Sequence, residues 1–217
     1  MPVEFYLCCV RILIVSATEN EIKKLRTFTD KNKSPHSIDI IVTGIGAVAT
    51  TYALTKQLQK NKYHLTLNFG LAGSFNSDLE IGSVVNVTQD NFADIGAEDG
   101  EDFLTLSEME LDGDNEIMNE SKINNKVLEC IPKVCGITVN TVHGNEKSIE
   151  KVFNRFRPNT ESMEGASFLF CCIMEKVPCA QIRAVSNFVE RRNKNNWNIQ
   201  LAIENLNMKA IEILKAF

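Results

Sequence analysis

Apolar and polar positions follow two patterns that alternate along the chain. Short apolar runs rich in β-branched residues predict buried strands, and longer segments with an apolar residue every three or four positions predict helices. The predicted strands are 11–16, 38–43, 65–69, 83–88, 136–142 and 179–186. The predicted helices are 18–29, 47–60, 125–131, 148–156, 164–176 and 197–215. This alternation predicts an α/β fold with a mixed, largely parallel central sheet flanked by helices.

Few other segments interrupt this alternation. Glycine pairs close two of the strands, Gly44 with Gly46 after 38–43, and Gly70 with Gly73 after 65–69. The region 89–120 is acidic, and we expect it to be irregular. No linker rich in Pro, Gly or Ser divides the chain, so the sequence predicts one domain over 11–217, preceded by an N-terminal extension, 1–10.

Composition then excludes several classes of partner. The formal net charge of −5 disfavours general binding to nucleic acid or to an anionic membrane. No apolar stretch approaches the roughly 20 residues that a membrane span needs. The seven cysteines show no zinc-ligand spacing and mostly lie in apolar runs. With no recognisable signal peptide, these features predict a cytoplasmic protein with reduced cysteines and no bound metal.

Three polar side chains lie in segments that we expect beyond the strand ends, where ligands bind in open α/β sheets. Glu21 follows the first strand, Glu164 begins the last-but-one helix, and Asn187 follows the last strand. Each also has a structural interpretation. Glu21 completes a Thr18-x-x-Glu21 capping box, Glu164 is an acid favoured in a first helical turn, and Asn187 is a turn residue. The residues alone leave both interpretations open.

Five motifs, taken in order, extend across nearly the whole chain. They are SATENE (16–21), TGIGAV (43–48), NFGLAG (68–73), SMEGA (162–166) and RAVSN (183–187). Each glycine motif is weak alone, but the ordered set with Met163-Glu164 resembles the nucleoside phosphorylase/nucleosidase superfamily. Within it, FADIGAED (92–99), ESMEG (161–165) and SNFV (186–189) are most similar to the futalosine hydrolases. The resemblance implies a three-layer sandwich and no cofactor.

The resemblance also implies a reaction, the hydrolysis of futalosine to hypoxanthine and dehypoxanthine futalosine in menaquinone biosynthesis. Glu21 would activate water, and Glu164 would accept hydrogen bonds from the two ribose hydroxyls. Met163 would pack on the sugar. The remaining substrate-binding positions implied on the strand ends are Gly46, Leu71, Ala72 and Gly73.

Two asparagines narrow the implied chemistry. Asn187 stands where adenine-specific methylthioadenosine/S-adenosylhomocysteine nucleosidases have Asp, and its amide suits O6 or N7 of a 6-oxopurine such as hypoxanthine. We therefore assign Asn187 to the leaving base. Asn68 stands where phosphorylases of the superfamily have a phosphate-binding Arg, so water is the expected nucleophile.

The basic segment 191–194 is by default a solvated surface. In futalosine hydrolases an Arg and a Trp occur in this region, so Arg192 and Trp197 are candidates for binding the benzoate tail of the substrate. Asn193 replaces an acid that often follows this Arg. His143 ends a predicted strand and is expected to be structural or peripheral.

Some features receive no firm role. Asp94, Glu98 and Asp99 resemble a family loop near the site but lack the regular spacing of a divalent-cation site. Relatives are commonly homodimers, so a homodimer is expected, with a small nucleoside as the only other partner. Two alternatives stay open: another purine nucleosidase, acting on methylthioadenosine, S-adenosylhomocysteine or inosine, and a non-catalytic nucleoside-binding protein. Both carboxylates, Glu21 and Glu164, argue against the second.

Overall fold

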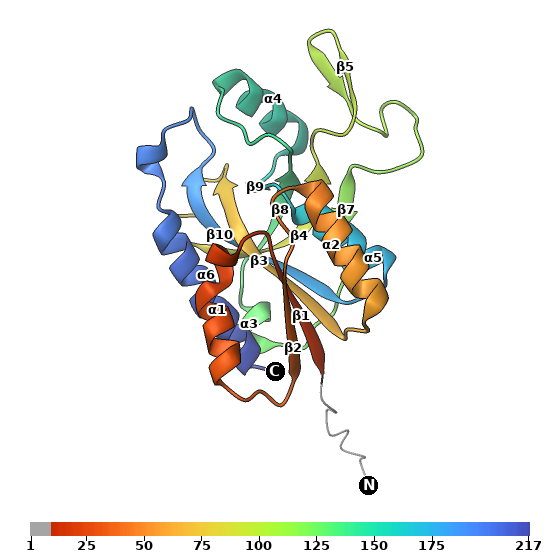
Figure 1. Ribbon diagram of the computed structural model, residues 1–217. Helices are drawn as coiled ribbons and strands as arrows, with labels where there is room; N and C mark the ends of the chain where they lie inside the picture. The colour runs from red at the N-terminus through yellow and green to blue at the C-terminus, as the bar shows by residue number, and fades with distance from the viewer. Residues whose placement is uncertain (1–9) are drawn as a thin grey trace.

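A central sheet lies between two layers of helices in the computed structural model, which describes residues 10–217 (Figure 1). Helices α1 (Glu19–Lys31) and α6 (Ile199–Lys215) cover one face, with the short α3 (Lys126–Glu129) against α6. Helices α2 (Ala47–Lys60) and α5 (Gly165–Met174) cover the other face. The predicted three-layer α/β sandwich is confirmed. The predicted extension lies, apart from Val10, outside the described residues.

The sheet combines parallel and antiparallel pairs. Its strands are β1 (Arg11–Ser16), β2 (Ser37–Val42), β3 (Leu65–Ser74), β4 (Val84–Phe92), β7 (Glu116–Met118), β8 (Lys133–Thr138), β9 (Thr160–Ser162) and β10 (Cys179–Phe188). Their order is β10-β4-β8-β9-β3-β1-β2, with β7 paired to β4 and β10 paired to β3. The last pairing closes β10, β4, β8, β9 and β3 into a ring, from which β1 and β2 extend as a parallel wing.

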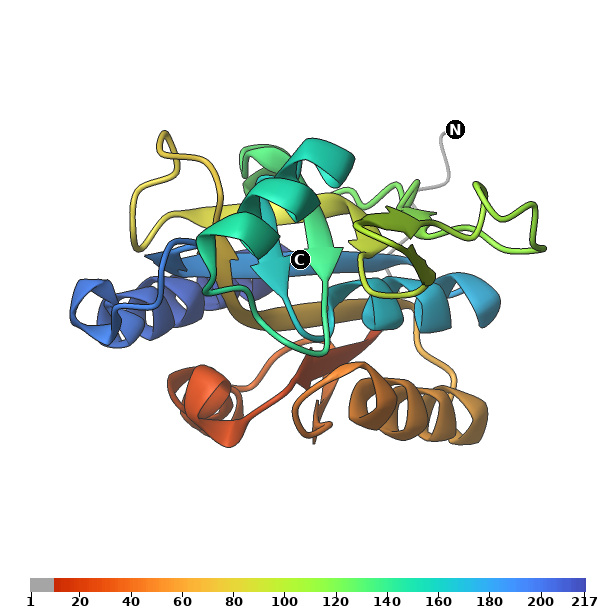
Figure 2. The ribbon, with the colours of Figure 1, turned by 90° about the horizontal axis from the view of Figure 1, so that it is seen from above.

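The first strand shows why both faces of the sheet are covered. Ile12 and Ile14 pack with α1 and α6, whereas Leu13 and Val15 pack with α2 and α5. Successive side chains of a strand point to opposite faces, so a continuous apolar run is buried only when helices cover both. This run therefore fixes the three layers and places the carboxyl end of β1 beside the start of α1 (Figure 2).

Strands β3 and β8 show how the observed strand bounds depart from the sequence prediction. Strand β3 does not end at Phe69 but continues through the glycines to Ser74, because Gly73 and Ser74 pair with both β10 and β9. Strand β8 covers Lys133–Thr138 rather than 136–142. The chain leaves the sheet after it because Asp94 accepts hydrogen bonds from the amide and the side chain of Asn140 (2.7 and 3.0 Å).

The acidic region 89–120 is more ordered than its composition predicts. Strand β4 extends to Phe92, and a small hairpin follows, β5 (Ala97–Asp99) with β6 (Asp102–Leu104). Helix α4 (Glu146–Phe156) holds this hairpin: Lys151 binds Glu101 (2.9 Å), and the Arg155 guanidinium lies 4.4 Å from the Phe103 ring centre. These partners are distant in sequence, so a local pattern could not predict the hairpin.

The helices largely follow their predicted ranges. The exception with consequences is the last one, because the segment Lys194–Asn196 forms a separate 3₁₀ turn that Trp197 terminates. Asn198 then caps α6 by accepting a hydrogen bond from the Leu201 amide (3.1 Å). Between residues 10 and 217, none of the helices combines the length and apolarity needed to cross a membrane.

Candidate active site

Glu21 lies in the first turn of α1, and two segments hold its carboxylate. Oε2 accepts hydrogen bonds from the Thr18 amide and hydroxyl (both 2.9 Å) and from the Ser16 hydroxyl (3.1 Å). Oε1 accepts one from the Leu71 amide of β3 (3.1 Å). The capping-box interpretation is confirmed. It does not describe the whole side chain, because the second oxygen faces the end of β3 and away from the helix.

Glu164 is the N-cap residue of α5. Its Oε1 accepts a hydrogen bond from the Gly46 amide (2.9 Å), which joins the start of α5 to the start of α2. Gly46 has φ +94°, a backbone conformation that favours glycine. Burial raises the pKa of Glu164, and nearby Glu21 adds to this, while Arg183 and the Gly46 amide oppose it.

Arg183 is the functional candidate that the sequence motif contained without a role. It lies on β10 and is only 1% exposed. A Cβ on Gly70 would lie 3.0 Å from Arg183 Nη1 and 3.4 Å from Glu21 Oε1, so this glycine leaves room for both side chains at the same point of β3. Nε and Nη2 have no hydrogen-bond partner among the described residues. Burial lowers the Arg183 pKa, whereas Glu164, Glu21 and Asp90 raise it.

An arginine between apolar residues of a predicted buried strand was itself a signal. A buried guanidinium is costly unless charged or polar partners surround it. The run Cys179–Phe188 therefore predicts acids nearby, and Glu21 and Glu164 are the two that the motifs supply.

Asn187 lies beside Gly73, after a bulge in β10. A Cβ on Gly73 would lie 3.2 Å from Asn187 Nδ2, so glycine makes room for the amide. Asn187 Oδ1 accepts from the Ser186 hydroxyl (2.8 Å), and Nδ2 donates to the Phe188 carbonyl (2.9 Å). Together these bonds fix the amide orientation and leave one Nδ2 hydrogen for a ligand.

His143 is better anchored than its expected peripheral role suggests. The Glu161 carboxylate, 4% exposed, accepts a hydrogen bond from the His143 amide (2.9 Å) and pairs with Nδ1 of its ring. Gly73 of β3 pairs with Glu161 of β9 on one side and with Asn187 of β10 on the other. The loop that carries His143 is therefore attached to the strand end where Asn187 lies.

The remaining predicted residues occupy two environments. Ala72 is buried, its carbonyl accepting from the Ser186 hydroxyl (3.3 Å), and Met163 is half-buried next to Glu164. Arg192 and Trp197 lie together, with the guanidinium 5.3 Å from the ring centre. Arg192 is exposed and lines a hollow of about 820 Å³ together with His143.

Asn68 does not reach the ligand side of the strand. It is 2% exposed, and its Nδ2 donates to the Val15 carbonyl of β1 (3.0 Å). Its role in this structure is to join β1 to β3.

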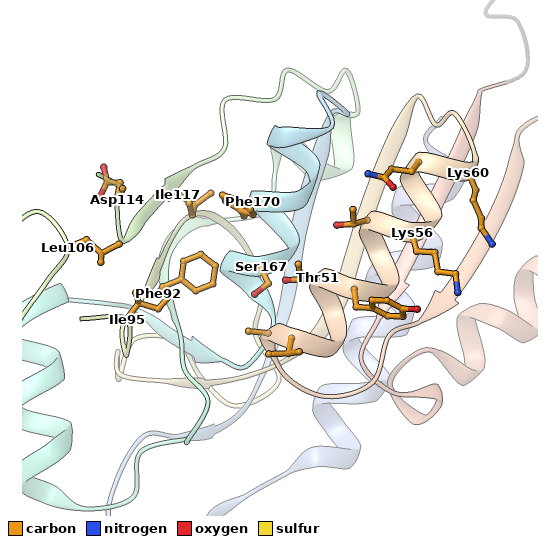
Figure 3. Close-up of a pocket in the computed structure, with 16 residues that line it drawn as sticks. Thr51, Lys56, Lys60, Phe92, Ile95, Leu106, Asp114, Ile117, Ser167 and Phe170 are labelled. Carbon is orange, nitrogen blue, oxygen red and sulfur yellow. The ribbon is translucent and has the colours of Figure 1, made fainter. Parts of the chain in front are cut away.

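A hollow of about 1090 Å³ lies between α2 and α5 and opens next to the Gly46–Glu164 bond, where it is lined by Ala47 and Ser167. In Figure 3, Thr51, Lys56 and Lys60 come from α2, and Ser167 and Phe170 of α5 lie between them and Phe92. We call this hollow the α2–α5 groove. Its walls are mostly apolar, in contrast to the charged side chains around Glu21, Glu164 and Arg183.

Comparisons with known proteins give the family and the fold of the chain. A curated futalosine hydrolase from Thermus thermophilus is 28% identical over 170 residues, covering 76% of this chain and 75% of that protein. Another, from Acidothermus cellulolyticus, is 27% identical over 215 residues, covering 91% of this chain and 87% of that protein. The solved structure of Helicobacter pylori futalosine hydrolase superposes with a TM-score of 0.82 at 17% identity, covering 96% of this chain and 98% of that one. The model of the "Phosphorylase superfamily" matches residues 11–217, and the chain therefore belongs to that superfamily.

Proposed function

We propose that this chain is an N-ribosyl hydrolase that cleaves futalosine to hypoxanthine and dehypoxanthine futalosine, a step of menaquinone biosynthesis. The observation that carries the proposal is the convergence of Glu21 and Glu164 on the buried Arg183, which lies in the middle of β10 opposite Gly70 of β3. The futalosine hydrolases among the relatives support the choice of substrate.

The two carboxylates suit the charge changes of the reaction. When the bond between C1′ and the purine nitrogen breaks, its electron pair leaves with the base and the sugar becomes cationic. Glu164 holds the ribose hydroxyls and its negative charge stabilises this cation. Water forms the new bond to C1′ and gives a proton to Glu21, which leaves the sugar as the free hemiacetal. Glu21 then releases this proton to solvent, and the departing purine anion takes up a proton from solvent to become hypoxanthine.

Arg183 supports both acids. Its Nε and Nη2 groups are buried without a hydrogen-bond partner among the described residues, and an ordered water would satisfy such a donor. We propose that this water is the nucleophile, shared between the Arg183 cation and the Glu21 carboxylate. An amide, Asn187, completes the site by donating to O6 or N7 of the departing hypoxanthine.

The test is a substrate panel with purified protein. Futalosine, methylthioadenosine and inosine are each incubated with and without phosphate, and the free base is measured. Release of hypoxanthine from futalosine, independent of phosphate, supports the proposal. Faster cleavage of methylthioadenosine would contradict futalosine as the substrate. A requirement for phosphate would contradict hydrolysis as the reaction. Binding of all three nucleosides without cleavage would contradict catalytic activity.

Asn187 yields a prediction about the base. Asn187→Asp places an acceptor and potential acid where the amide donor lies, so the ratio of kcat/KM for futalosine over methylthioadenosine should fall by about 10-fold or more. Competition assays with both nucleosides measure this ratio. Ser186 orients the amide, and Ser186→Ala should lower turnover on futalosine without moving the ratio towards methylthioadenosine. An unchanged ratio in Asn187→Asp contradicts the assignment of Asn187 to the base.

For the substrate tail, we propose Arg192 and Trp197 as the benzoate-binding pair. The guanidinium already lies over the indole and is exposed, so it is accessible to a carboxylate.

We also propose that the enzyme is a cytoplasmic homodimer whose interface includes the α2–α5 groove. Helix α2 exposes Val48 (80%) and Tyr52 (69%), and α5 exposes Phe170, Ile173 and Met174. Such a contiguous apolar face is typical of an interaction surface. Free cysteines at all five described positions are compatible with a reducing compartment.

The dimer proposal predicts that Tyr52→Glu yields a monomer, because a carboxylate would be buried without a partner at the interface. Light scattering coupled to size-exclusion chromatography measures the mass. Met208→Glu on α6, also an exposed apolar position (51%), is the matched control and should keep the wild-type mass. A wild-type monomer contradicts the proposal.

A further inference from the structure

Asp90 is a buried carboxylate that the reaction described above does not use. It lies on β4 and is 0% exposed. Its Oδ1 accepts a hydrogen bond from the Thr138 hydroxyl of β8 (3.0 Å), and its Oδ2 accepts one from the Gln181 amide of β10 (2.8 Å). Three strands of the ring therefore meet at this one side chain.

The same hydroxyl continues to the start of α5. Thr138 Oγ1 accepts a hydrogen bond from the Ala166 amide (2.7 Å), two residues after Glu164. A Cβ on Gly165 would lie 2.2 Å from Asp90 Oδ2 and 2.3 Å from Gln181 Nε2. The first turn of α5 is therefore bonded to the Asp90 network through Ala166 and rests directly on it at Gly165.

Charge places a second constraint on this turn. A negative group below a helix N-terminus is favourable, and Arg183 acts on both Asp90 and Glu164. Burial raises the Asp90 pKa to about 6, while Gln181, Thr138 and Arg183 lower it. An apolar residue at position 90 would avoid the cost of burying a carboxylate. The cost of burying the Asp90 carboxylate is explained if this group fixes the first turn of α5, which packs against it.

We propose that Asp90 is a positioning residue for Glu164: through Thr138 and against Gly165, it fixes the first turn of α5 and thereby the carboxylate that holds the ribose. This inference rests on the proposed role of Glu164 in ribose binding, but it does not depend on which purine nucleoside is cleaved.

The decisive variant is Thr138→Val, which removes the bridging hydroxyl and keeps the shape of the side chain. Amide hydrogen exchange at Ala166 should become on the order of 10-fold faster, because one hydrogen bond is lost. For the nucleoside that the wild type cleaves, kcat/KM should fall by roughly 10²-fold, as expected for a misplaced binding group. Affinity for free hypoxanthine, which has no ribose, should not change. Asp90→Ala should act in the same direction, and Thr138→Ser should restore both exchange and turnover.

Thr66→Val is the matched control. Thr66 is a buried strand threonine on β3 whose hydroxyl has no hydrogen-bond partner in the described part of the chain, so neither measurement should move. Unchanged Ala166 exchange in Thr138→Val overturns the proposal, and so does a parallel loss of hypoxanthine binding, which would indicate general disruption. The exchange measurement needs no substrate. If the wild type fails to cleave futalosine while Ala166 exchange still accelerates, the proposed function is overturned and the positioning of the turn is supported.

Discussion

Replacing Glu21 with Gln should lower kcat by about 10²- to 10⁴-fold, the usual contribution of a general base, while nucleoside affinity stays close to that of the wild type. The amide keeps the size of the side chain but cannot take a proton from water. Steady-state kinetics gives kcat, and titration calorimetry gives affinity without requiring turnover. Near-normal turnover in this variant would contradict the proposed mechanism.

The control must separate catalysis from helix capping, because one carboxylate does both. Glutamine has to place its NH₂ group opposite either the Leu71 or the Thr18 amide, both of which are donors. Some loss of stability is therefore expected in Glu21→Gln. Thr18→Ala should lose about 1 kcal/mol of the free energy of unfolding through the weakened cap, with a much smaller loss of turnover. A similar kcat loss in both variants would assign the effect to helix placement instead.

Replacing Arg183 with Met should have the largest effect on stability, about 3–5 kcal/mol, because it leaves buried carboxylates without their cation. Turnover should also fall by roughly 10²-fold, since Glu21 and Glu164 lose the group between them. The size of the stability loss should depend on pH. Arg183 lowers the pKa values of Glu164 and Asp90, so the variant raises both in the folded state.

The sign follows from proton uptake. A carboxyl whose folded pKa lies above its unfolded value makes the folded state less stable as pH rises through the interval between the two. The penalty of Arg183→Met should therefore be larger at pH 8 than at pH 5, as measured by urea unfolding at both values. Arg183→Lys, which keeps the charge, should show less of this pH dependence. Equal losses at both pH values in Arg183→Met would mean that Arg183 acts through packing rather than charge.

The sequence contained more of the fold than of the site. Ile12 and Leu13 point to opposite faces of one strand, and both are apolar. A strand that is apolar on both faces must be covered on both, so the apolar pattern was enough to predict two helical layers. It failed where long-range pairing overrides local propensity, as when β3 continues through Gly70 and Gly73. Each of these glycines is explained by a neighbouring side chain, not by a turn.

Within the site, motif positions indicated which acids to expect but not what joins them. Glu21 lies in the first third of the chain and Glu164 in the last third. The charge of Arg183 interacts with both carboxylates. The pairing of Glu161 with His143 and the bonds of Asp90 each connect segments 18 or more residues apart. The periodic spacing of apolar residues along the chain cannot predict such long-range contacts. A charged or polar residue inside an apolar strand, as at Arg183 and Gln181, is the one local signal that points to them.

The parallel wing leaves strand β2 at an open edge of the sheet. Ring closure pairs β3 and β10 on both sides, but β2 pairs only with β1 among the described residues, so one row of its backbone groups is free to recruit a strand from another molecule. Asp39 interrupts this otherwise apolar strand, and its carboxylate binds Arg11 and Tyr63. A charge at the centre of an edge strand opposes strand addition. We therefore expect Asp39 to oppose aggregation through β2, a role separate from any contact with substrate.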